Sequence, residues 1–433
     1  MTLTEALAWL DARLDHETAT PSISAGRIEG LSLEPMLELM ALLGDPQHAA
    51  PVIHITGTNG KGAVAEMISA LLSAHGLSVG TYTSPHQERL NERIRRDGEP
   101  ISGEDLAETF AGIAAVESLL GHRPTWFEAV TAAAFRWFAE APVDVMVVEV
   151  GLLGRYDATN VVRAAVAVIT SIGGDHTDFA EGWQVEVASE KAGIIDAESI
   201  AVLGDIGPEL VAVFSAEGPA ELVRFGEDFD VDSDLVAVGG HVADLRGLHG
   251  SYPEVFLPVH GAHQVTNASV ALAAVEAFFG RALPHDVVEE AFGSLELRGR
   301  FEVADHGPLV VLDGAHNPDA LEALAQTLDE EFTPTGSRYV VLGALAGRDV
   351  DAIVSAVAEL RPDLVLCTST EGDRGVAAAA LAATASRHDL AAEAVADPAD
   401  AVARALALAA EEDVVVVTGS FRLLAPARAT LVP

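Results

Sequence analysis

The chain has 433 residues, of which 49% are apolar and 21% are charged, so it carries enough apolar material for a buried core and is not predominantly disordered. Its 25 basic and 66 acidic residues give a formal net charge of −41, which repels nucleic acids and anionic membranes, and we expect neither as a partner. The single cysteine, Cys367, excludes a disulfide framework.

The first residues show no basic stretch followed by an apolar run, and no segment reaches the ~18 consecutive apolar residues of a membrane span. We therefore expect the protein in a reducing cytoplasm. The excess of acidic residues is explained either by solubility or by adaptation to high salt, and the sequence leaves both explanations open.

The first half of the chain alternates predicted strands and helices. Residues 1–50 predict two helical segments around a loop at 22–30. The strands predicted next are 51–56, 79–83, 144–150 and 165–171, and the helices are 63–75, 103–120 and 125–140. Continuous apolar strands of this kind are typical of a parallel sheet that is covered on both faces. Residues 235–259 then predict a small antiparallel region, and 261–280 predict an alanine-rich helix.

A second alternation begins near residue 298. Its predicted strands are 308–312, 339–342, 364–367 and 414–417, and its predicted helices are 317–330, 349–360, 375–386 and 397–410. Helical spacers of this length between apolar strands indicate a doubly wound α/β sheet. The break between the two series is expected near 293–299.

A glycine-rich loop, Gly57-Thr-Asn-Gly-Lys61-Gly-Ala63, lies between a predicted strand and a predicted helix. Glycines let backbone N–H groups face phosphate oxygens, the helix N-terminus adds partial positive charge, and the lysine can reach the terminal phosphates. The spacing is shorter than that of the general nucleotide loop. We expect phosphate binding here; the alternative is a tight turn with an exposed lysine.

Lysine is almost absent from the chain. Lys61 and Lys191 are the two lysines, and the other 23 basic residues are arginine. A lysine can be deprotonated and modified, whereas an arginine effectively cannot. We therefore expect both lysines to stand where arginine cannot replace them, although chance survival would give the same count.

Two polar residues follow neighbouring apolar strands. Glu149 ends the strand at 144–150, and His176 follows the strand at 165–171. Ligands of open α/β sheets bind at this edge, and a carboxylate, a hydroxyl and an imidazole can complete a magnesium shell shared with phosphates. The alternatives are a salt-bridged strand end for Glu149 and a hydrogen-bonding role for His176.

The chain resembles the folylpolyglutamate synthase/dihydrofolate synthase family of the Mur ligase superfamily. The segments that carry the resemblance are Gly57–Lys61, Thr83–His86, Leu90–Ile94, Thr125–Thr131, Glu149–Asn160, Ile169–Phe179, Glu190–Ile194, Gly261–Ala268, Arg298–Glu302 and Leu312–Pro318. They occur in order over most of the chain, and the Asp-Gly-Ala-His-Asn-Pro form of the last one favours the folate branch over the cell-wall branch.

The resemblance implies which residues bind ATP and which take part in the chemistry. The implied ATP contacts are Thr58, Asn59, Gly60, Lys61, Gly62, Ala63, Asn267, Arg300, Asp313 and His316, with Asn267 at the adenine. The implied catalytic residues are Lys61, Lys191, Arg300 and His316. A guanidinium and an imidazole can stabilise the charge that spreads over a transferred phosphoryl group.

The resemblance also implies two Mg²⁺ ions, the first held by Ser84 and Glu149 and the second by Glu149 and His176. It implies that Lys191 is carbamoylated by CO2, which turns a cation into an anionic oxygen ligand. Arginine cannot undergo that change. The alternative is an unmodified Lys191 paired with acidic neighbours. The implied folate contacts are Phe127, Arg155 and Asp157.

The chain departs from the family pattern at several positions. Ala63 stands where serine is usual, Leu153 where glycine is usual, and Gly174 where a larger apolar residue is usual; Arg348 precedes Asp349 where lysine is common. These departures put the details of the pteridine pocket in doubt more than the phosphate chemistry.

We therefore expect two α/β domains with ATP between them. Residues 1–295 would form a P-loop-type ATP-binding domain with a mostly parallel sheet, a small antiparallel region and the folate site, and 296–433 a Rossmann-like glutamate ligase domain. The expected reaction adds L-glutamate to dihydropteroate or to a reduced folate through an acyl phosphate, and we expect a monomer. The alternatives are a ligase for a cell-wall precursor and a nucleotide-binding regulatory module. The sequence leaves the acceptor and the polyglutamate length and linkage open.

Overall fold

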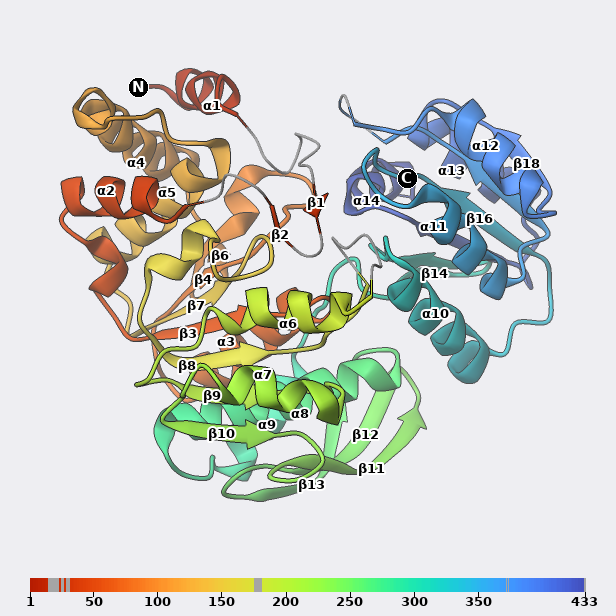
Figure 1. Ribbon diagram of the computed structural model, residues 1–433. Helices are drawn as coiled ribbons and strands as arrows, with labels where there is room; N and C mark the ends of the chain where they lie inside the picture. Colours follow the sequence, from red (N-terminus) through yellow and green to blue (C-terminus); the bar gives the residue numbers. More distant parts are fainter. Residues whose placement is uncertain are drawn as a thin grey trace. The chain divides into compact units, whose positions relative to one another are not determined.

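A computed structural model describes residues 1–14, 23–24, 27–28, 32–174, 181–370, 372 and 374–431. Most of the predicted loop at 22–30, and His176, lie outside the described residues. Contacts divide the chain into two compact units (Figure 1). The N-terminal unit comprises Met1–Leu235, Val242–Pro258 and Gln264–Leu295, and the C-terminal unit comprises Val236–His241, Val259–His263 and Glu296–Pro433.

The N-terminal unit alternates helices and strands over most of its length. Its helices are α1 (Leu3–Asp11), α2 (Glu34–Leu42), α3 (Lys61–Ala74), α4 (Gly103–Val116), α5 (Trp126–Glu140), α6 (Trp183–Ala192), α7 (Val211–Ser215), α8 (Ala262–Phe279) and α9 (His285–Gly293). Its strands are β1 (Ile23–Ser24), β2 (Arg27–Ile28), β3 (Val52–Thr56), β4 (Val79–Tyr82), β5 (Ile94–Arg96), β6 (Glu99–Pro100), β7 (Val145–Glu149), β8 (Ala164–Ile169), β9 (Ile200–Leu203) and β10 (Glu221–Arg224). Strands β11 (Asp230–Ala237), β12 (Gly240–Arg246) and β13 (Ser251–Leu257) form a separate sheet.

The main sheet of this unit has the order β10-β9-β8-β3-β7-β4-β5-β6. The strands from β10 to β4 are parallel, and β5 and β6 add antiparallel edges. Strand β3 lies between β7 and β8, with Ile55 opposite Glu149 and Thr56 opposite Ile169. Because the three strands are parallel, the residues that follow them meet at one edge of the sheet.

The strands β3, β7 and β8 are buried along nearly their whole length, as expected for a sheet covered on both faces. Helices α1, α2, α4 and α5 share one apolar core with residues of β3, β4 and β7, and α6 and α7 share another with β8 and β9. Helix α3 packs on β3, β4 and β7 and also against α9, which in turn contacts β13 (Figure 1).

The C-terminal unit is a second α/β sheet. Its helices are α10 (Pro318–Thr327), α11 (Val350–Val357), α12 (Ala378–Arg387), α13 (Pro398–Leu408) and α14 (Leu424–Leu431). Its strands are β14 (Glu302–His306), β15 (Leu309–Leu312), β16 (Arg338–Leu342), β17 (Leu364–Cys367), β18 (Ala392–Ala394) and β19 (Val414–Thr418), in the order β14-β15-β19-β16-β17-β18 with only β14 antiparallel among these described strands.

Alternate residues of β19 face opposite helical layers. Val414 and Val416 pack with α10, α11 and α12, whereas Val415 and Val417 pack with α13 and α14. A side-chain period of two along a strand that is buried on both faces produces this arrangement. The expected α/β class, with mostly parallel sheets and a small antiparallel region, is confirmed.

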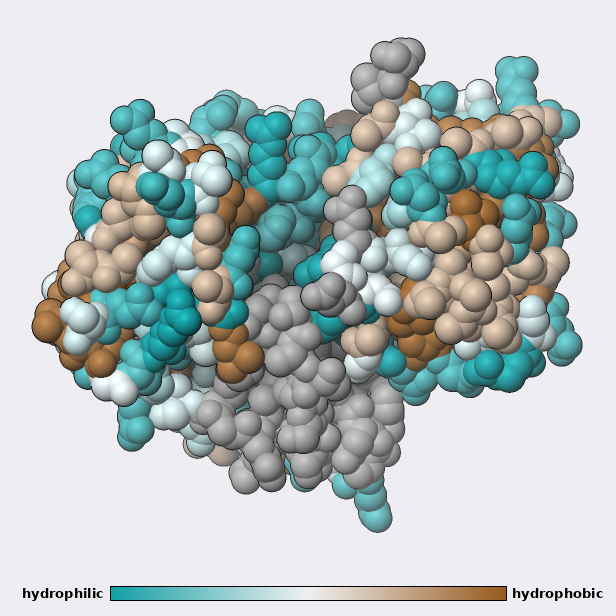
Figure 2. Space-filling view, turned by 90° about the horizontal axis from the view of Figure 1, so that it is seen from above, coloured by the Kyte–Doolittle hydropathy of each residue, from teal (hydrophilic) through white to brown (hydrophobic). Residues whose placement is uncertain are grey.

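Hydrophilic residues are spread over the face seen in Figure 2, and apolar residues form patches between them. Among the described residues, every helix is too short or too polar to cross a lipid bilayer.

Candidate active site

The glycine loop joins β3 to α3 and packs tightly against its neighbours. Gly57 has φ +152° and Gly60 has φ +85°, conformations that favour glycine. A Cβ atom on Gly57 would lie 1.8 Å from Thr170 Oγ1, and one on Gly60 would lie 2.6 Å from Asn267 Oδ1. Both glycines are therefore required by close approach as well as by the backbone turn.

Residues that follow β8 hold the loop in place. The backbone N–H of Thr58 donates to Ser171 O at 2.9 Å, and Thr170 Oγ1 donates to Asn59 O at 2.6 Å. The loop is thus ordered by contacts to a neighbouring strand end, immediately before the N-terminus of the 14-residue helix α3. Our sequence reasoning missed the roles of Thr170 and Ser171. Two hydroxyl residues directly after an apolar strand, at the sheet edge where ligands bind, were the available signal.

The two lysines of the chain meet at this loop. Lys61 Nζ donates to Gly57 O at 2.9 Å and to Thr58 O at 3.1 Å, and Lys191 Nζ donates to the same Gly57 O at 2.8 Å. Lys191 is 5% exposed, in the last turn of α6. The structure therefore brings together the two lysines that the sequence analysis singled out.

Asn267 contacts the glycine loop from α8. Its Nδ2 donates to Gln264 Oε1 at 2.9 Å, an orientation that directs Oδ1 toward Gly60. Gln264, which the sequence analysis did not single out, thereby orients this amide. The role of Asn267 at an adenine stays a prediction.

Glu149 and Ser84 lie together at the end of β7. Glu149 is 2% exposed, and its Oε2 accepts a hydrogen bond from the backbone N–H of Ser84 at 2.9 Å. The two side chains offer a carboxylate and a hydroxyl oxygen, which are ligands that Mg²⁺ accepts. This oxygen donor set fits the predicted first metal.

The predicted second metal depends on His176, which lies outside the described residues. Within the described part of the chain, no three or more His, Cys, Asp or Glu side chains are grouped so that they could hold a metal ion. The ligand set of Glu149, His176 and a modified Lys191 therefore stays a prediction.

The loop after β7 is fastened to α6, the helix that carries Lys191. Asn160 Nδ2 donates to Gly193 O at 2.9 Å, and the Arg155 N–H donates to Glu190 O at 2.8 Å. A Cβ atom on Gly154 would lie 3.0 Å from Lys191 O, so glycine permits this close packing. These contacts position the backbone of Lys191.

The side chain of Arg155, a predicted folate contact, takes part in the contacts between this loop and α6. Its guanidinium donates to Ser189 O at 3.0 Å and pairs with Glu217. The structure therefore places this guanidinium against α6 and the end of α7, in a different set of contacts from those of Glu149 and Ser84. Its role toward folate stays a prediction.

A buried polar network lies under the same loop. Asp157, 5% exposed, accepts hydrogen bonds from Leu152 N at 2.9 Å and from the hydroxyl of Thr159 at 2.5 Å, and Thr159 Oγ1 is 2.9 Å from His54 Nε2. Burial raises the pKa of Asp157 despite these donors, and burial lowers the pKa of His54 to about 3. Asp157 thus stabilises the conformation of the loop through buried hydrogen bonds. Its role as a folate contact stays a prediction.

Phe127, the third predicted folate contact, lies in the first turn of α5 and is 9% exposed. Its ring centroid lies 6.2 Å from that of Tyr82, and a Cβ atom on Gly151 would lie 2.2 Å from its Cζ. The ring therefore packs on Gly151, in the loop that follows Glu149.

In the C-terminal unit, Arg300, Asp313 and His316 lie around the end of β15. Asp313 accepts hydrogen bonds at 2.7 Å from the backbone N–H groups of Phe301 and Ala315, which ties the segment before β14 to the loop after β15. Burial raises the pKa of Asp313 to about 6, against the lowering effect of these donors and of the Arg300 charge. His316 Nδ1 donates to Gly314 O at 2.7 Å, which fixes the orientation of its imidazole ring.

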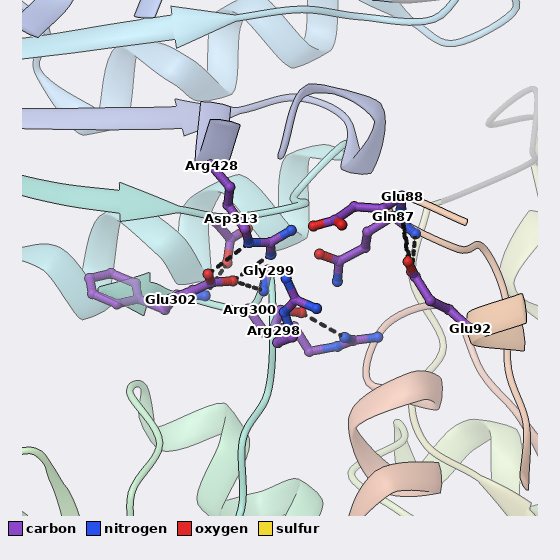
Figure 3. A network of polar contacts seen from close by, with 10 residues as sticks. Gln87, Glu88, Glu92, Arg298, Gly299, Arg300, Glu302, Asp313 and Arg428 are labelled. Atoms are coloured by element: carbon purple, nitrogen blue, oxygen red, sulfur yellow. Dashed lines mark hydrogen bonds and ion pairs between the residues drawn. The ribbon is translucent and has the colours of Figure 1, made fainter. Parts of the chain in front are cut away.

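A partly buried ion pair between Arg428 and Glu302 holds the segment that carries Arg300, because Glu302 also binds the backbone of Gly299 (Figure 3). Arg428 in α14 donates from Nε to Glu302 Oε1 at 2.8 Å and from a terminal nitrogen to Glu302 Oε2 at 2.5 Å, and Gly299 N also donates to Oε2. Burial alone raises the pKa of Glu302, but the hydrogen bonds from Arg428 and Gly299 outweigh it and lower that pKa. Nothing local in the sequence indicates the role of Arg428, because its partner lies 126 positions away in the chain.

Two family models match the chain. The Mur ligase middle domain matches residues 55–275, and the Mur ligase glutamate ligase domain matches residues 299–421. The dihydrofolate synthase/folylpolyglutamate synthase of Mycobacterium tuberculosis is 42% identical over 383 residues, which cover 82% of this chain and 78% of the relative. The enzyme of the same name from Escherichia coli is 35% identical, with 91% and 90% covered.

Comparison with solved structures leads to the same family as the sequence comparisons. A Mycobacterium tuberculosis folylpolyglutamate synthase complexed with ADP superposes with a TM-score of 0.91 at 38% identity, covering 100% of this chain and 98% of that one. A bifunctional folylpolyglutamate synthase/dihydrofolate synthase with Mn, AMPPNP and L-glutamate bound gives a TM-score of 0.85 at 31% identity, with 100% and 98% covered. The chain therefore belongs to the dihydrofolate synthase/folylpolyglutamate synthase family, with the Mur ligase middle and glutamate ligase domains in that order.

Proposed function

We propose that the protein is an ATP-dependent ligase that joins L-glutamate to dihydropteroate, to a reduced folate, or to both. The observation that carries this proposal is the convergence of Lys61 and Lys191 on Gly57 O, in a glycine loop at the N-terminus of α3. The relatives named above bear this activity in their names, and the related structures contain ADP, or AMPPNP with L-glutamate.

In the first step, a carboxylate oxygen of the acceptor attacks the γ-phosphorus of ATP. An O–P bond to the acceptor forms, the bond to the β-phosphate oxygen breaks, and ADP leaves. Activation is needed because a free carboxylate is a poor electrophile. The backbone N–H groups of the glycine loop and the ammonium of Lys61 would bind the phosphates before and during this transfer.

Arg300 and His316 would act on the transferred group. Charge spreads over the phosphoryl oxygens as the bond to ADP breaks, and a guanidinium and a protonated imidazole Nε2 can donate hydrogen bonds to them. The hydrogen bond from Nδ1 to Gly314 O fixes the orientation of the imidazole.

In the second step, the amine of L-glutamate attacks the acyl carbon. A tetrahedral intermediate forms, the C–O bond to phosphate breaks, and phosphate leaves with the amide formed. Mg²⁺ held by Ser84 and Glu149 would offset repulsion between the anionic carboxylate and the triphosphate.

We also propose that Lys191 is carbamoylated and that His176 and Glu149 bind a second Mg²⁺. We further propose residues 1–295 as the ATP- and folate-binding domain, residues 296–433 as the glutamate ligase domain, a cytoplasmic monomer, and ATP use that depends on both domains.

The test is to supply dihydropteroate and tetrahydrofolate separately, each with ATP and L-glutamate, and to identify the products by mass. We expect ADP release that requires both the acceptor and glutamate, and a product heavier by one glutamyl residue. ADP release with a UDP-sugar peptide in place of the pteridine would favour a cell-wall ligase. ATP binding without glutamate-dependent ADP release would indicate a regulatory module.

Two variants connect the activity to the site. Lys61→Ala and Glu149→Gln should each lower kcat by roughly 10²- to 10³-fold, the usual effect of removing one electrostatic group from a transition-state site. His75→Ala, at the far end of α3 from the loop, is the matched control and should retain the wild-type rate. Wild-type turnover by Lys61→Ala would refute the assignment of the glycine loop.

A further inference from the structure

Phe421 lies at the same end of the C-terminal sheet as Arg300 and His316. It begins a short 3-10 helix, η8 (Phe421–Leu423), three residues after the end of β19. The turn that carries it is tied to the loop after β15, because Gly419 N donates to Ala315 O at 2.8 Å and Asp313 N donates to Val417 O at 3.0 Å. The position of the phenyl ring is thus set relative to that loop.

The half-buried ring fits against that loop without space to spare. A Cβ atom on Gly314 would lie 2.4 Å from Phe421 Cε1 and 2.5 Å from its Cζ. The other side of the ring packs with the apolar core formed by β15, β19, α13 and α14. Because the ring packs against both the apolar core and the backbone of Gly314, it has little room to change its rotamer.

Both candidate phosphoryl-binding side chains contact this ring. The Cζ atom of Arg300 lies 5.4 Å from the ring centroid, within the range of a cation–π interaction, and the His316 ring centroid lies 6.2 Å away with the planes at 59°. Among the described residues, no carboxylate forms an ion pair with Arg300; its guanidinium donates to Arg298 O at 3.3 Å.

A phenyl face supports the Arg300 guanidinium in a different way from a carboxylate. A carboxylate partner would orient the guanidinium but would also occupy its N–H donors and neutralise its charge. A phenyl face attracts the cation through its quadrupole and takes up none of the five donors. The same ring limits the swing of the imidazole about the bond that Nδ1 makes to Gly314 O.

We propose that Phe421 is a positioning residue that holds the Arg300 guanidinium and the His316 imidazole ready for the transferred phosphoryl group. This inference rests on the proposed function, because it acts through those two residues. It adds a residue to the site that carries no polar group and makes no contact of its own with the reacting atoms.

Phe421→Leu removes the aromatic face and keeps an apolar side chain, and Phe421→Tyr keeps the face. We expect kcat to fall about three- to tenfold in Phe421→Leu, with a smaller change in the KM for ATP, and to stay within about twofold in Phe421→Tyr. If Phe421→Leu misfolds, Phe421→Met serves as the unbranched apolar substitute.

A double-variant cycle separates positioning from packing. In an Arg300→Ala background the ring has no guanidinium to hold, so Phe421→Leu should lower kcat much less than it does in the wild type. Leu423→Ala, in the same 3-10 helix and 1% exposed, is the packing control and should lower the urea midpoint while keeping kcat within about twofold.

Equal loss of kcat in both backgrounds would overturn the positioning of Arg300, and an unchanged kcat in Phe421→Leu would overturn the positioning role altogether; either result leaves the ligase intact. A wild-type protein without glutamate-dependent ADP release would instead overturn the proposed function itself. The two failures are therefore distinguishable in one set of assays.

Discussion

Lys61 and Lys191 donate hydrogen bonds to the same carbonyl oxygen, that of Gly57, at 2.9 and 2.8 Å. Two ammonium groups on one oxygen repel each other, and both would attract an anion placed beside the loop. Uptake of CO2 by Lys191 would replace one of these cations by a carbamate anion and release two protons, one from the ammonium group and one as the N–C bond forms, which relieves the repulsion. The geometry thus suits both phosphate binding by Lys61 and the proposed modification of Lys191.

The modification can be tested by chemical rescue. Lys191→Ala should lower kcat by at least roughly 10²-fold, since it removes a ligand-bearing side chain from the site. Acetate or propionate should restore part of the activity, because a small carboxylate can replace the carbamate. Lys191→Arg should stay inactive with either acid, because an arginine is not carbamoylated and leaves no room. Rescue of Lys191→Ala by methylamine and not by acetate would show that the ammonium form is the active one.

Leu153 has φ +59°, where glycine is favoured, yet the residue is 6% exposed. The left-handed backbone costs about 1–2 kcal/mol, whereas burial of a leucine side chain contributes about 1.5–3 kcal/mol. Leu153→Gly loses the burial and adds about 0.5–1 kcal/mol of chain flexibility, so it should be less stable than the wild type by about 1 kcal/mol.

The matched variant is Leu153→Ala, which loses the same burial but keeps the strain of a Cβ atom. We therefore expect Leu153→Gly to be the more stable of the two in urea unfolding, the reverse of the usual order in regular structure. A more stable Leu153→Ala would show that the backbone at this position carries no strain.

Asp313 should make the stability of the C-terminal unit fall as pH rises. Its pKa of about 6 in the folded state is above its unfolded value, so its contribution is full below about pH 4 and is lost as pH rises through 6. Asp313→Asn lacks this titration. Between pH 4 and 7 the wild type should lose about 2 kcal/mol of unfolding free energy relative to the variant. A constant difference over that range would contradict the raised pKa.

The contribution of Glu331 to the free energy of unfolding should depend on pH in the opposite direction. Its carboxylate accepts hydrogen bonds from His241 Nε2 at 2.9 Å, from His260 Nδ1 at 2.6 Å and from Gly261 N at 2.5 Å. Burial opposes ionisation, but these donors outweigh it and lower the pKa of Glu331 to about 2. Because the folded pKa is depressed, the stabilisation is present above the unfolded value and is lost as pH falls.

The measurement is urea unfolding of wild type and Glu331→Gln from pH 6 to 3.5. The advantage of the wild type should shrink by about 1 kcal/mol over that range. Glu330→Gln, on the same segment, is the control and should track the wild type throughout. A widening advantage at low pH would contradict the assignment of the charge to Glu331.

Much of the fold could be predicted from the sequence because buried strands appear in it as continuous runs of apolar residues. Segments 51–56, 144–150, 165–171 and 414–417 were predicted as strands and lie in β3, β7, β8 and β19. Short edge strands such as β5, β6 and β18 were not predicted, since two or three residues carry no periodicity. Helix α10 continues as a π-helical turn to Phe332, a detail that no local pattern signals.

The candidate site divides in the same way. The sequence by itself determined the chemistry available to this protein, because the glycine loop, the two lysines and the Asp-Gly-Ala-His segment are local patterns whose residue types can be read directly. Only the tertiary structure decided which groups meet. The contacts of Gly57 O with Lys191, of Glu302 with Arg428, and of Gly314 with Phe421 join residues more than a hundred positions apart. Such contacts arise from strand order and helix packing, which bring together the ends of distant strands, and no local pattern records them.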